Sequence, residues 1–146
     1  MICVRDILRE RRTGEVWQIE RTATVYQALE QLAAHDIGAL PVVENGKLVG
    51  IFSERDYARK VILHGKSSRE ATVGELMSSP VTTVGPGDTV ETCMALMTTR
   101  RIRHLPVMEN DQMIGLVSIG DIVKAVIDDQ RVAIRDLENY VTGRSY

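Results

Sequence analysis

Gly50-Ile51-Phe52-Ser53-Glu54-Arg55-Asp56 recurs sixty-five residues later as Gly115-Leu116-Val117-Ser118-Ile119-Gly120-Asp121. Each copy follows a Leu-Pro-Val triplet, Leu40-Pro41-Val42 or Leu105-Pro106-Val107, at the same separation. Residues 21–61 align with residues 86–126 at this offset without a gap, and twelve positions are identical: Thr24, Val25, Ile37, Leu40, Pro41, Val42, Glu44, Asn45, Gly50, Ser53, Asp56 and Val61. Repeats of this kind are supersecondary units that bury their apolar faces together. The chain is therefore predicted to be one unit written twice and packed as a single pseudo-symmetric domain.

The first copy has the pattern of a β-α-β-β-α unit. Apolar residues at helical spacing predict a helix over residues 25–36, and Thr24 with Gln27 forms a capping pattern at its start. Two β-rich runs, residues 39–44 and 48–52, are joined by Asn45-Gly46, a dipeptide that supplies the positive φ angles of a tight hairpin. We expect a short strand over residues 16–19 before the helix, and a second helix that begins near Ser53.

The second copy predicts the same order of elements: a strand over 81–84, a helix over 90–100, strands over 105–109 and 113–117, and a helix after Ser118. The chain thus divides into repeat one with its N-terminal segment (1–63), a polar linker (64–72), repeat two (73–130) and a C-terminal amphipathic helix (131–146). The apolar stripe of this last helix needs a partner surface. The predicted fold class is mixed α/β (α+β), with the two repeats related by pseudo-two-fold symmetry.

Composition excludes several classes of function. With 146 residues, 44% of them hydrophobic, the chain can bury a substantial core without disulfides. Cys93 replaces Ala28 of the other repeat on the buried face of a helix, which favours a core thiol over a reactive one. No secretory leader and no membrane-spanning apolar run is found, so a soluble cytoplasmic protein without a membrane partner is expected. A net charge of −2 and a single short basic cluster, residues 9–12, argue against nucleic-acid binding.

The pattern Ser-x-x-Asp at the end of a strand has two interpretations. A single copy is a helix-capping pattern with a purely structural role. Its recurrence at matching repeat positions favours a binding role, because two hydroxyls and two carboxylates then lie in the first turns of helices that follow hairpins. Helix N-termini favour phosphate, and a carboxylate accepts hydrogen bonds from ribose hydroxyls. This site chemistry suits a nucleotide.

The two motifs resemble those of the cystathionine β-synthase (CBS) domain family, whose signatures are an apolar-Pro strand and a Gly-apolar-apolar-Ser/Thr-x-x-Asp turn. The resemblance covers roughly residues 4–130. It implies a tandem pair, called a Bateman module, that regulates instead of catalysing and binds adenosine-type ligands in two clefts. Residues 54–60 also resemble a subgroup of short stand-alone CBS-pair proteins, some of which accept NAD. The expected ligands are therefore AMP, ADP or ATP, with NAD as a further one, and no catalytic cofactor or metal is expected.

The resemblance implies crossed sites, in which strand residues of one repeat meet the Ser-x-x-Asp turn of the other. Asp56 and Asp121 would hold ribose, and Ser53 and Ser118 would hold phosphate. One site would combine Ser118 and Asp121 with Val16, Trp17, Ile37, Gly38 and Ala39. The other would combine Ser53 and Asp56 with Val81, Thr82, Ile102, Arg103 and His104.

These implied sites differ in charge. Arg103-His104 stands where the first repeat has Gly38-Ala39, and Arg55 stands where the second repeat has Gly120. The cleft with Ser53 and Asp56 should therefore prefer the more phosphorylated ligand. Solvated surface charges are the alternative interpretation of both arginines. Trp17 either stacks on adenine or packs in the core.

Three classes of function remain to be weighed. A nucleotide sensor that signals to a separate, unidentified effector protein is favoured, because the chain leaves no room for an effector domain. A constitutive dimeric scaffold without a ligand is the alternative. An enzyme is disfavoured, since the histidines and cysteines show neither metal-ligand spacing nor a nucleophile motif. We expect a homodimer in which the stripe Ile134, Leu137 and Val141 adds apolar contact.

Overall fold

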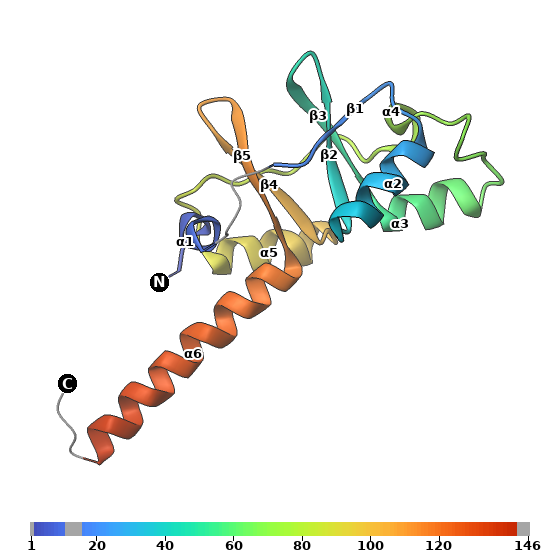
Figure 1. Ribbon diagram of the computed structural model, residues 1–146. Coiled ribbons are helices and arrows are strands. Elements are labelled where there is room, and N and C mark those ends of the chain that lie inside the picture. The colour runs from blue at the N-terminus through green and yellow to red at the C-terminus, as the bar shows by residue number, and fades with distance from the viewer. Residues whose placement is uncertain (1, 11–15, 143–146) are drawn as a thin grey trace. The chain divides into compact units, whose positions relative to one another are not determined.

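The first repeat folds around a three-stranded sheet. The computed structural model describes residues 2–10 and 16–142. Strand β1 pairs in parallel with β2, and β2 pairs antiparallel with β3 (Figure 1). The elements of this repeat are β1 (Ile19–Glu20), α2 (Val25–His35), β2 (Ala39–Glu44), β3 (Lys47–Ser53), α3 (Glu54–Asp56) and the π-helix η1 (Tyr57–Ile62).

The second repeat follows the same order of elements, and the fold class is mixed α/β as predicted. Its hairpin and helices are α5 (Val90–Arg100), β4 (His104–Glu109), β5 (Gln112–Ser118) and α6 (Ile119–Val141). Val84 forms a parallel bridge with Val107, and Ile19 pairs in parallel with Val42 at the same repeat positions. The repeat seen in the sequence is therefore also a repeat of strand register.

Local sequence determines most of these boundaries. Thr24 accepts a hydrogen bond from the Gln27 amide while the Gln27 side chain accepts one from Thr24, so the predicted capping box is confirmed. The predicted hairpin turn is confirmed as well, since Asn45 and Gly46 have φ angles of 52° and 78°. Asn110 and Asp111 adopt the same left-handed conformation in the second hairpin.

Four predicted elements need correction. The strand expected over 16–19 is limited to Ile19–Glu20, because Trp17 and Gln18 are exposed and gain no burial by pairing. The strand expected over 81–84 reduces to the single bridge of Val84, since Gly85-Pro86-Gly87 follows at once and proline offers no N–H. The helix near Ser53 is one α-turn that widens into η1. The C-terminal helix is continuous with the helix after Ser118, and its last residues, 143–146, lie outside the described residues.

Two short helices, α1 (Val4–Arg9) and α4 (Val73–Leu76), precede the two repeats along the chain. The chain forms two compact units, each with its own apolar core. The first-repeat unit comprises the described residues of Glu15–Thr82 together with Asn110–Met113, so it includes α4. The second-repeat unit comprises the described residues of Met1–Gly14, Thr83–Glu109 and Ile114–Tyr146, so it includes α1. Val73 and Leu76 are accordingly buried in the first-repeat core, and Val4 and Ile7 in the second-repeat core.

Two glycines at matching repeat positions, Gly50 and Gly115, allow close packing against α4 and α1 respectively. A Cβ on Gly115 would lie 2.7 Å from Cδ2 of Leu8, which belongs to α1. A Cβ on Gly50 would collide with the side chain of Met77, the residue directly after α4, and lie 3.1 Å from the Ser78 carbonyl oxygen. The glycine of the Gly-apolar-apolar-Ser motif is thus required by close packing against β3 and β5.

Replacement of Gly115 tests the position of α1 within its unit. We expect Gly115→Ala to lower the free energy of unfolding by about 1–3 kcal/mol, because the added methyl overpacks the contact with Leu8. Leu8→Ala shortens the opposing side chain, so the double variant should be at least about 0.5 kcal/mol more stable than the sum of the single changes predicts. Urea denaturation of the four proteins measures this difference. Strictly additive losses would contradict the contact between α1 and β5.

Candidate functional site

Both Ser-x-x-Asp motifs form reciprocal capping boxes. The Ser53 amide donates to Oδ2 of Asp56 at 2.9 Å, and the Asp56 amide donates to the Ser53 hydroxyl at 3.2 Å. Ser118 and Asp121 make the same pair of bonds at 2.8 and 3.2 Å. The capping role is therefore confirmed for both copies, and each carboxylate is held in the first turn of its helix.

Each turn lies next to the residues that precede the proline strand of its own repeat. The Glu54 amide donates to the Gly38 carbonyl at 3.0 Å, and the Ile119 amide donates to the Arg103 carbonyl at 2.8 Å. Gly38 thus adjoins the start of α3, whereas the exposed Arg103 adjoins the start of α6. The same backbone hydrogen bond places a residue without a side chain beside one turn and a guanidinium-bearing residue beside the other.

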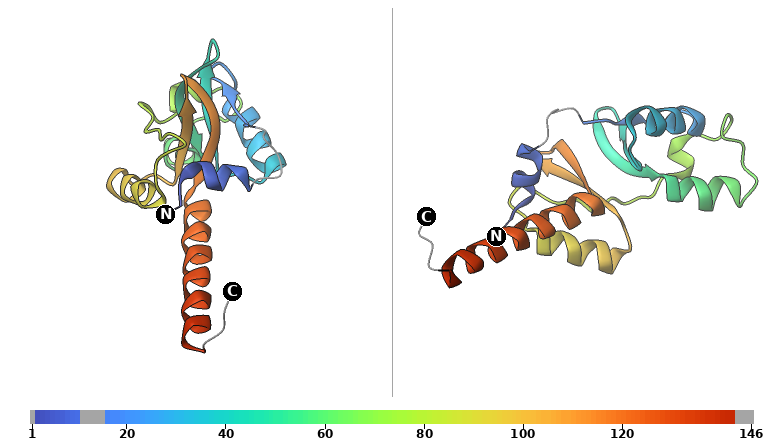
Figure 2. Two further views of the ribbon diagram at one scale, coloured as in Figure 1. Left: turned by 90° about the vertical axis from the view of Figure 1, so that its left-hand side faces the viewer. Right: turned by 60° about the horizontal axis from the view of Figure 1, so that its bottom comes forward.

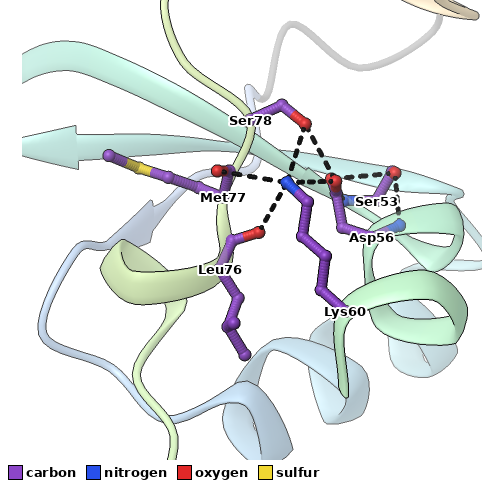
Figure 3. Close-up of polar contacts among 6 residues, drawn as sticks. All are labelled: Ser53, Asp56, Lys60, Leu76, Met77 and Ser78. Atoms are coloured by element: carbon purple, nitrogen blue, oxygen red, sulfur yellow. Dashed lines mark hydrogen bonds and ion pairs between the residues drawn. The ribbon is translucent and has the colours of Figure 1, made fainter. Parts of the chain in front are cut away.

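Asp56 is a buried member of a polar cluster in the first-repeat unit (Figure 3). Its side chain is only 9% exposed and forms an ion pair of 3.1 Å with the Lys60 ammonium group. Oδ1 also accepts from the Ser78 hydroxyl at 2.8 Å, and Oδ2 accepts from the Ser53 hydroxyl at 3.0 Å. Lys60 further donates to the carbonyl oxygens of Leu76 and Met77 at 3.2 and 3.5 Å. This cluster ties the helix after β3 to the segment that follows α4.

Lys60 and Ser78 were not among the residues expected from the sequence. Asp56 and Lys60 are four residues apart, the spacing of neighbours on one helix face, so the sequence could have predicted this ion pair. The contact of Ser78 with Asp56 could not be predicted from the sequence, because only the path of the chain after α4 brings the two residues together. At the position of Lys60 the second repeat has Ala125, which packs against its apolar core.

His104 lies in the electrostatic field of the second-repeat turn. Burial lowers the pKa of its imidazole below the ordinary value, the Asp121 carboxylate opposes that shift, and Arg103 adds to it. His104, Arg103 and Asp121 therefore form one group of interacting side chains within the second-repeat unit. An imidazole that is neutral at pH 7 donates or accepts hydrogen bonds without adding charge.

Trp17 lies on the surface and not in the core. Its indole is stacked on the His35 imidazole, with ring centroids 3.5 Å apart and planes inclined by 11°. The side chain is 39% exposed. The core interpretation of Trp17 is therefore wrong, and stacking on adenine stays a prediction in which one indole face is already taken by His35.

The remaining expected site residues differ in exposure. Ala39 is buried, and Arg55 is exposed on the single turn of α3. Ile37 and Ile102 are partly buried and pack against the cores of their own units. Val81 and Thr82 are partly buried in the passage between the repeats, and Val16 is partly buried directly before Trp17. The crossed combination of these residues stays a prediction.

Cys93 is fully buried on α5, and the predicted core thiol is confirmed. Burial, with a smaller contribution from Asp88, raises the pKa of this thiol to about 11. A thiol of that pKa is protonated at neutral pH and is a poor nucleophile. Cys93 therefore contributes packing.

None of the helices within residues 2–10 and 16–142 combines the length and apolar character that a bilayer crossing requires. Over the same residues, no three His, Cys, Asp or Glu side chains gather closely enough to hold a metal ion. Of the basic cluster at residues 9–12, Arg9 forms an ion pair with Asp6 and is exposed, whereas residues 11 and 12 lie outside the described residues.

The repeat architecture and the paired turns define a tandem pair of one structural unit. The CBS domain family model matches residues 4–63 and residues 73–128, so the chain belongs to the CBS domain family and carries a pair of these domains. Pairs of CBS domains are generally regulatory modules that often bind adenosine ligands. The resemblance seen in the sequence is thereby confirmed.

Individual relatives agree with this assignment. The chain is 45% identical over 125 residues to CBSX3, a mitochondrial CBS domain-containing protein of Arabidopsis thaliana, and the match covers 82% of this chain but only 61% of that relative. A solved protein with CBS domains from Burkholderia ambifaria is 44% identical, with a TM-score of 0.85 and coverage of 88% of this chain and 96% of the other. A CBS domain pair solved in complex with 5′-methylthioadenosine and S-adenosyl-L-methionine is 26% identical, with a TM-score of 0.77 and coverage of 88% and 98%.

The lowered pKa of His104 predicts how stability depends on pH. The unfolded chain binds a proton at His104 below about pH 6.5, whereas the folded chain resists it until a lower pH. The contribution of His104 is therefore fully present above this pH and is lost as the pH falls through the lowered folded-state pKa. We expect the free energy of unfolding to decrease from pH 7.5 to pH 5.5, and His104→Gln to make that decrease shallower.

Urea denaturation at several pH values within this window measures the slope for each protein. The exposed His64 provides a matched control, because His64→Gln should leave the slope as it is in the wild type. An equal slope in wild type and His104→Gln would show that the burial of the imidazole has no energetic consequence.

Proposed function

We propose that this protein is a regulatory module that binds an adenine nucleotide and thereby controls a separate partner protein. The observation that carries this proposal is the group at the start of α6, where the Ser118–Asp121 capping box lies beside Arg103 and His104. The proposal thus assigns Arg103 and His104 to the turn of their own repeat, and it departs here from the crossed pairing with Ser53 and Asp56 that the resemblance implied. Membership of the CBS domain family supports the regulatory class, and the related pair with bound methylthioadenosine and S-adenosylmethionine supports an adenosine ligand. AMP, ADP and ATP are the proposed ligands, and NAD is a further one that keeps the same adenosine half.

The chemistry of this group matches the parts of a nucleotide. The N-terminus of the 23-residue helix α6 presents backbone amides and a partial positive charge, which favour phosphate. The Arg103 guanidinium adds charge-assisted hydrogen bonds to phosphate oxygens. The Asp121 carboxylate accepts hydrogen bonds from a ribose diol. We propose the corresponding roles for Ser53, Arg55 and Asp56 in the other repeat, and a stacking role on adenine for Trp17.

The two other classes of function predict different results. A constitutive scaffold would bind no nucleotide, and an enzyme would convert the nucleotide that it binds. Mass analysis of the small molecules that the purified protein releases on denaturation, followed by incubation of the protein with AMP and ATP, separates the three classes. Bound adenine nucleotide without turnover supports the sensor.

Substitution of Asp121 tests the ribose contact. Loss of a charge-assisted hydrogen bond costs about 1.5–3 kcal/mol, so Asp121→Ala should weaken AMP binding by roughly 10- to 150-fold at the affected site. Isothermal titration calorimetry measures the affinity, and thermal melting confirms that the variant is folded despite the loss of its cap. Arg103→Ala is the companion variant and should weaken AMP much more than adenosine, because only AMP carries the phosphate.

Two results would count against these assignments. AMP affinity that is unchanged in Asp121→Ala would remove the ribose contact from this turn. An equal loss of AMP and adenosine binding in Arg103→Ala would mean that Arg103 supports the strand and not the phosphate.

We also propose that the protein forms a homodimer through α6. The second half of this helix extends away from β4 and β5, and Figure 2 shows this from two further directions. Six of its exposed apolar residues recur at spacings of three, four or seven on one helix face, and together they form the α6 stripe: Ile119, Val123, Ile127, Ile134, Leu137 and Val141. A stripe of this length on one helix face matches the seam by which two helices pair.

A charge placed in the α6 stripe should separate the protomers. We expect Ile134→Lys combined with Leu137→Lys to convert a dimer into a monomer, because both charges would be buried in the seam. Sedimentation equilibrium at tens of micromolar measures the mass. Val132→Lys is the matched control, since Val132 is equally exposed but lies off the stripe, and it should remain dimeric. A wild-type monomer at this concentration would contradict the proposal.

A further inference from the structure

The Asp56 carboxylate has its acceptor positions filled from within the chain. A carboxylate offers about four such positions. Oδ2 receives the amide and the hydroxyl of Ser53, at 2.9 and 3.0 Å. Oδ1 receives the Ser78 hydroxyl at 2.8 Å and the Lys60 ammonium group at 3.1 Å (Figure 3). A ribose hydroxyl can therefore bind Asp56 only if one of these donors leaves.

The four donors differ in how readily they can leave. Both Ser53 contacts belong to the capping box, and their loss would open the start of α3. The Ser78 backbone is held to β3 in both directions, since its amide donates to the Ile51 carbonyl at 2.8 Å and its carbonyl accepts from the Ile51 amide at 3.0 Å. Its hydroxyl therefore stays close to Asp56.

Lys60 is the donor whose departure would cost least. Its side chain is 39% exposed, so the ammonium group can regain water on leaving Asp56. The same group already lies 3.2 Å from the Leu76 carbonyl oxygen and 3.4 Å from the Ser78 hydroxyl, which offer acceptors after a small movement. Release of Lys60 thus disturbs the fold least.

The second repeat has no lysine at the position that matches Lys60. The residue four positions after Asp121 is Ala125, whose methyl group cannot approach a carboxylate as a donor. The two Ser-x-x-Asp turns therefore have the same backbone conformation but differ in the residue one helical turn after the carboxylate, which is Lys60 in the first repeat and Ala125 in the second.

We propose that Lys60 competes with the ligand's ribose hydroxyls for the Asp56 carboxylate and so lowers the affinity of the Asp56 turn for the nucleoside. This inference rests on the proposed function and names a specificity-determining residue within it. The ammonium group neutralises Asp56 when no ligand is bound, and the ribose diol replaces it on binding. Every ligand whose ribose binds Asp56 must then break this ion pair, and the free energy of the pair is subtracted from the binding free energy of the ligand.

The test measures adenosine binding by calorimetry in an Asp121→Ala background, so that the Asp56 turn is the one observed. Lys60→Met keeps the aliphatic stem and removes the competing charge. We expect adenosine affinity to increase by roughly 5-fold, which corresponds to an ion pair of about 1 kcal/mol. If the Asp121→Ala protein binds no detectable adenosine, detectable binding after Lys60→Met supports the proposal equally. Lys66→Met, a loss of charge at an exposed lysine of the same unit, should leave the affinity unchanged.

Comparison of adenosine with AMP separates this role from a phosphate contact. If Lys60→Met weakens AMP and leaves adenosine unchanged, Lys60 binds phosphate and the proposal is wrong. Unchanged or weaker adenosine binding in Lys60→Met overturns it as well. Lys60→Gln keeps a polar donor for the Leu76 carbonyl and replaces Lys60→Met if that variant fails to fold.

The reciprocal change provides a second measurement. In an Asp56→Ala background, Ala125→Lys introduces the competing ammonium group beside Asp121 and should weaken adenosine binding, again by roughly 5-fold. If the wild-type protein binds none of adenosine, AMP, ADP, ATP and NAD, the proposed function fails. If the wild type binds and the lysine variants have no effect, the competition alone fails.

Discussion

The reciprocal hydrogen bonds between serine and aspartate in each repeat determine where the last strand ends and the next helix begins. A cap of this kind contributes only about 1 kcal/mol, but its position has larger consequences. It directs the chain out of the hairpin at Ser53 and Ser118, and it leaves the next amide to bond with Gly38 or Arg103. The carboxylate to which we assign the ribose contact is thereby held by the same bonds that form the fold. The observed capping role is compatible with the proposed binding role, because the cap would pre-orient the acceptor.

The parts of the fold that sequence predicts well are those with a local cause. The helices α2 and α5 begin at threonine caps, and both hairpin turns contain residues that accept positive φ angles. The positions of α1 and α4 could not be predicted in this way. Each helix buries only two apolar residues, and nothing in such a short segment indicates which core receives them. The glycines at positions 50 and 115 are the trace that this packing leaves in the sequence.

The candidate site shows the same division. The repeat in the sequence is sufficient to pair Ser53 with Ser118 and Asp56 with Asp121, since equal repeat positions imply equal geometry. It could not indicate that Ser78 reaches Asp56, because that contact depends on the path of the chain after α4. The stacking of Trp17 could not be predicted for the same reason. Its neighbour in space is His35, from the end of α2, and no spacing in the sequence connects the two rings.

Duplication gives the two Ser-x-x-Asp turns the same backbone, and single substitutions around them then make them unequal. A buried carboxylate needs a partner whether or not a ligand is present, because an unpaired charge in the interior is costly. At Asp56 that partner is Lys60, which lies one helical turn later, and its positive charge neutralises the carboxylate. Beside Asp121 the chain places Arg103 and a His104 whose burial favours the uncharged form, so that turn retains a cation suited to phosphate. The two repeats have therefore diverged in how each turn balances its carboxylate, with the strand and helix framework left in common.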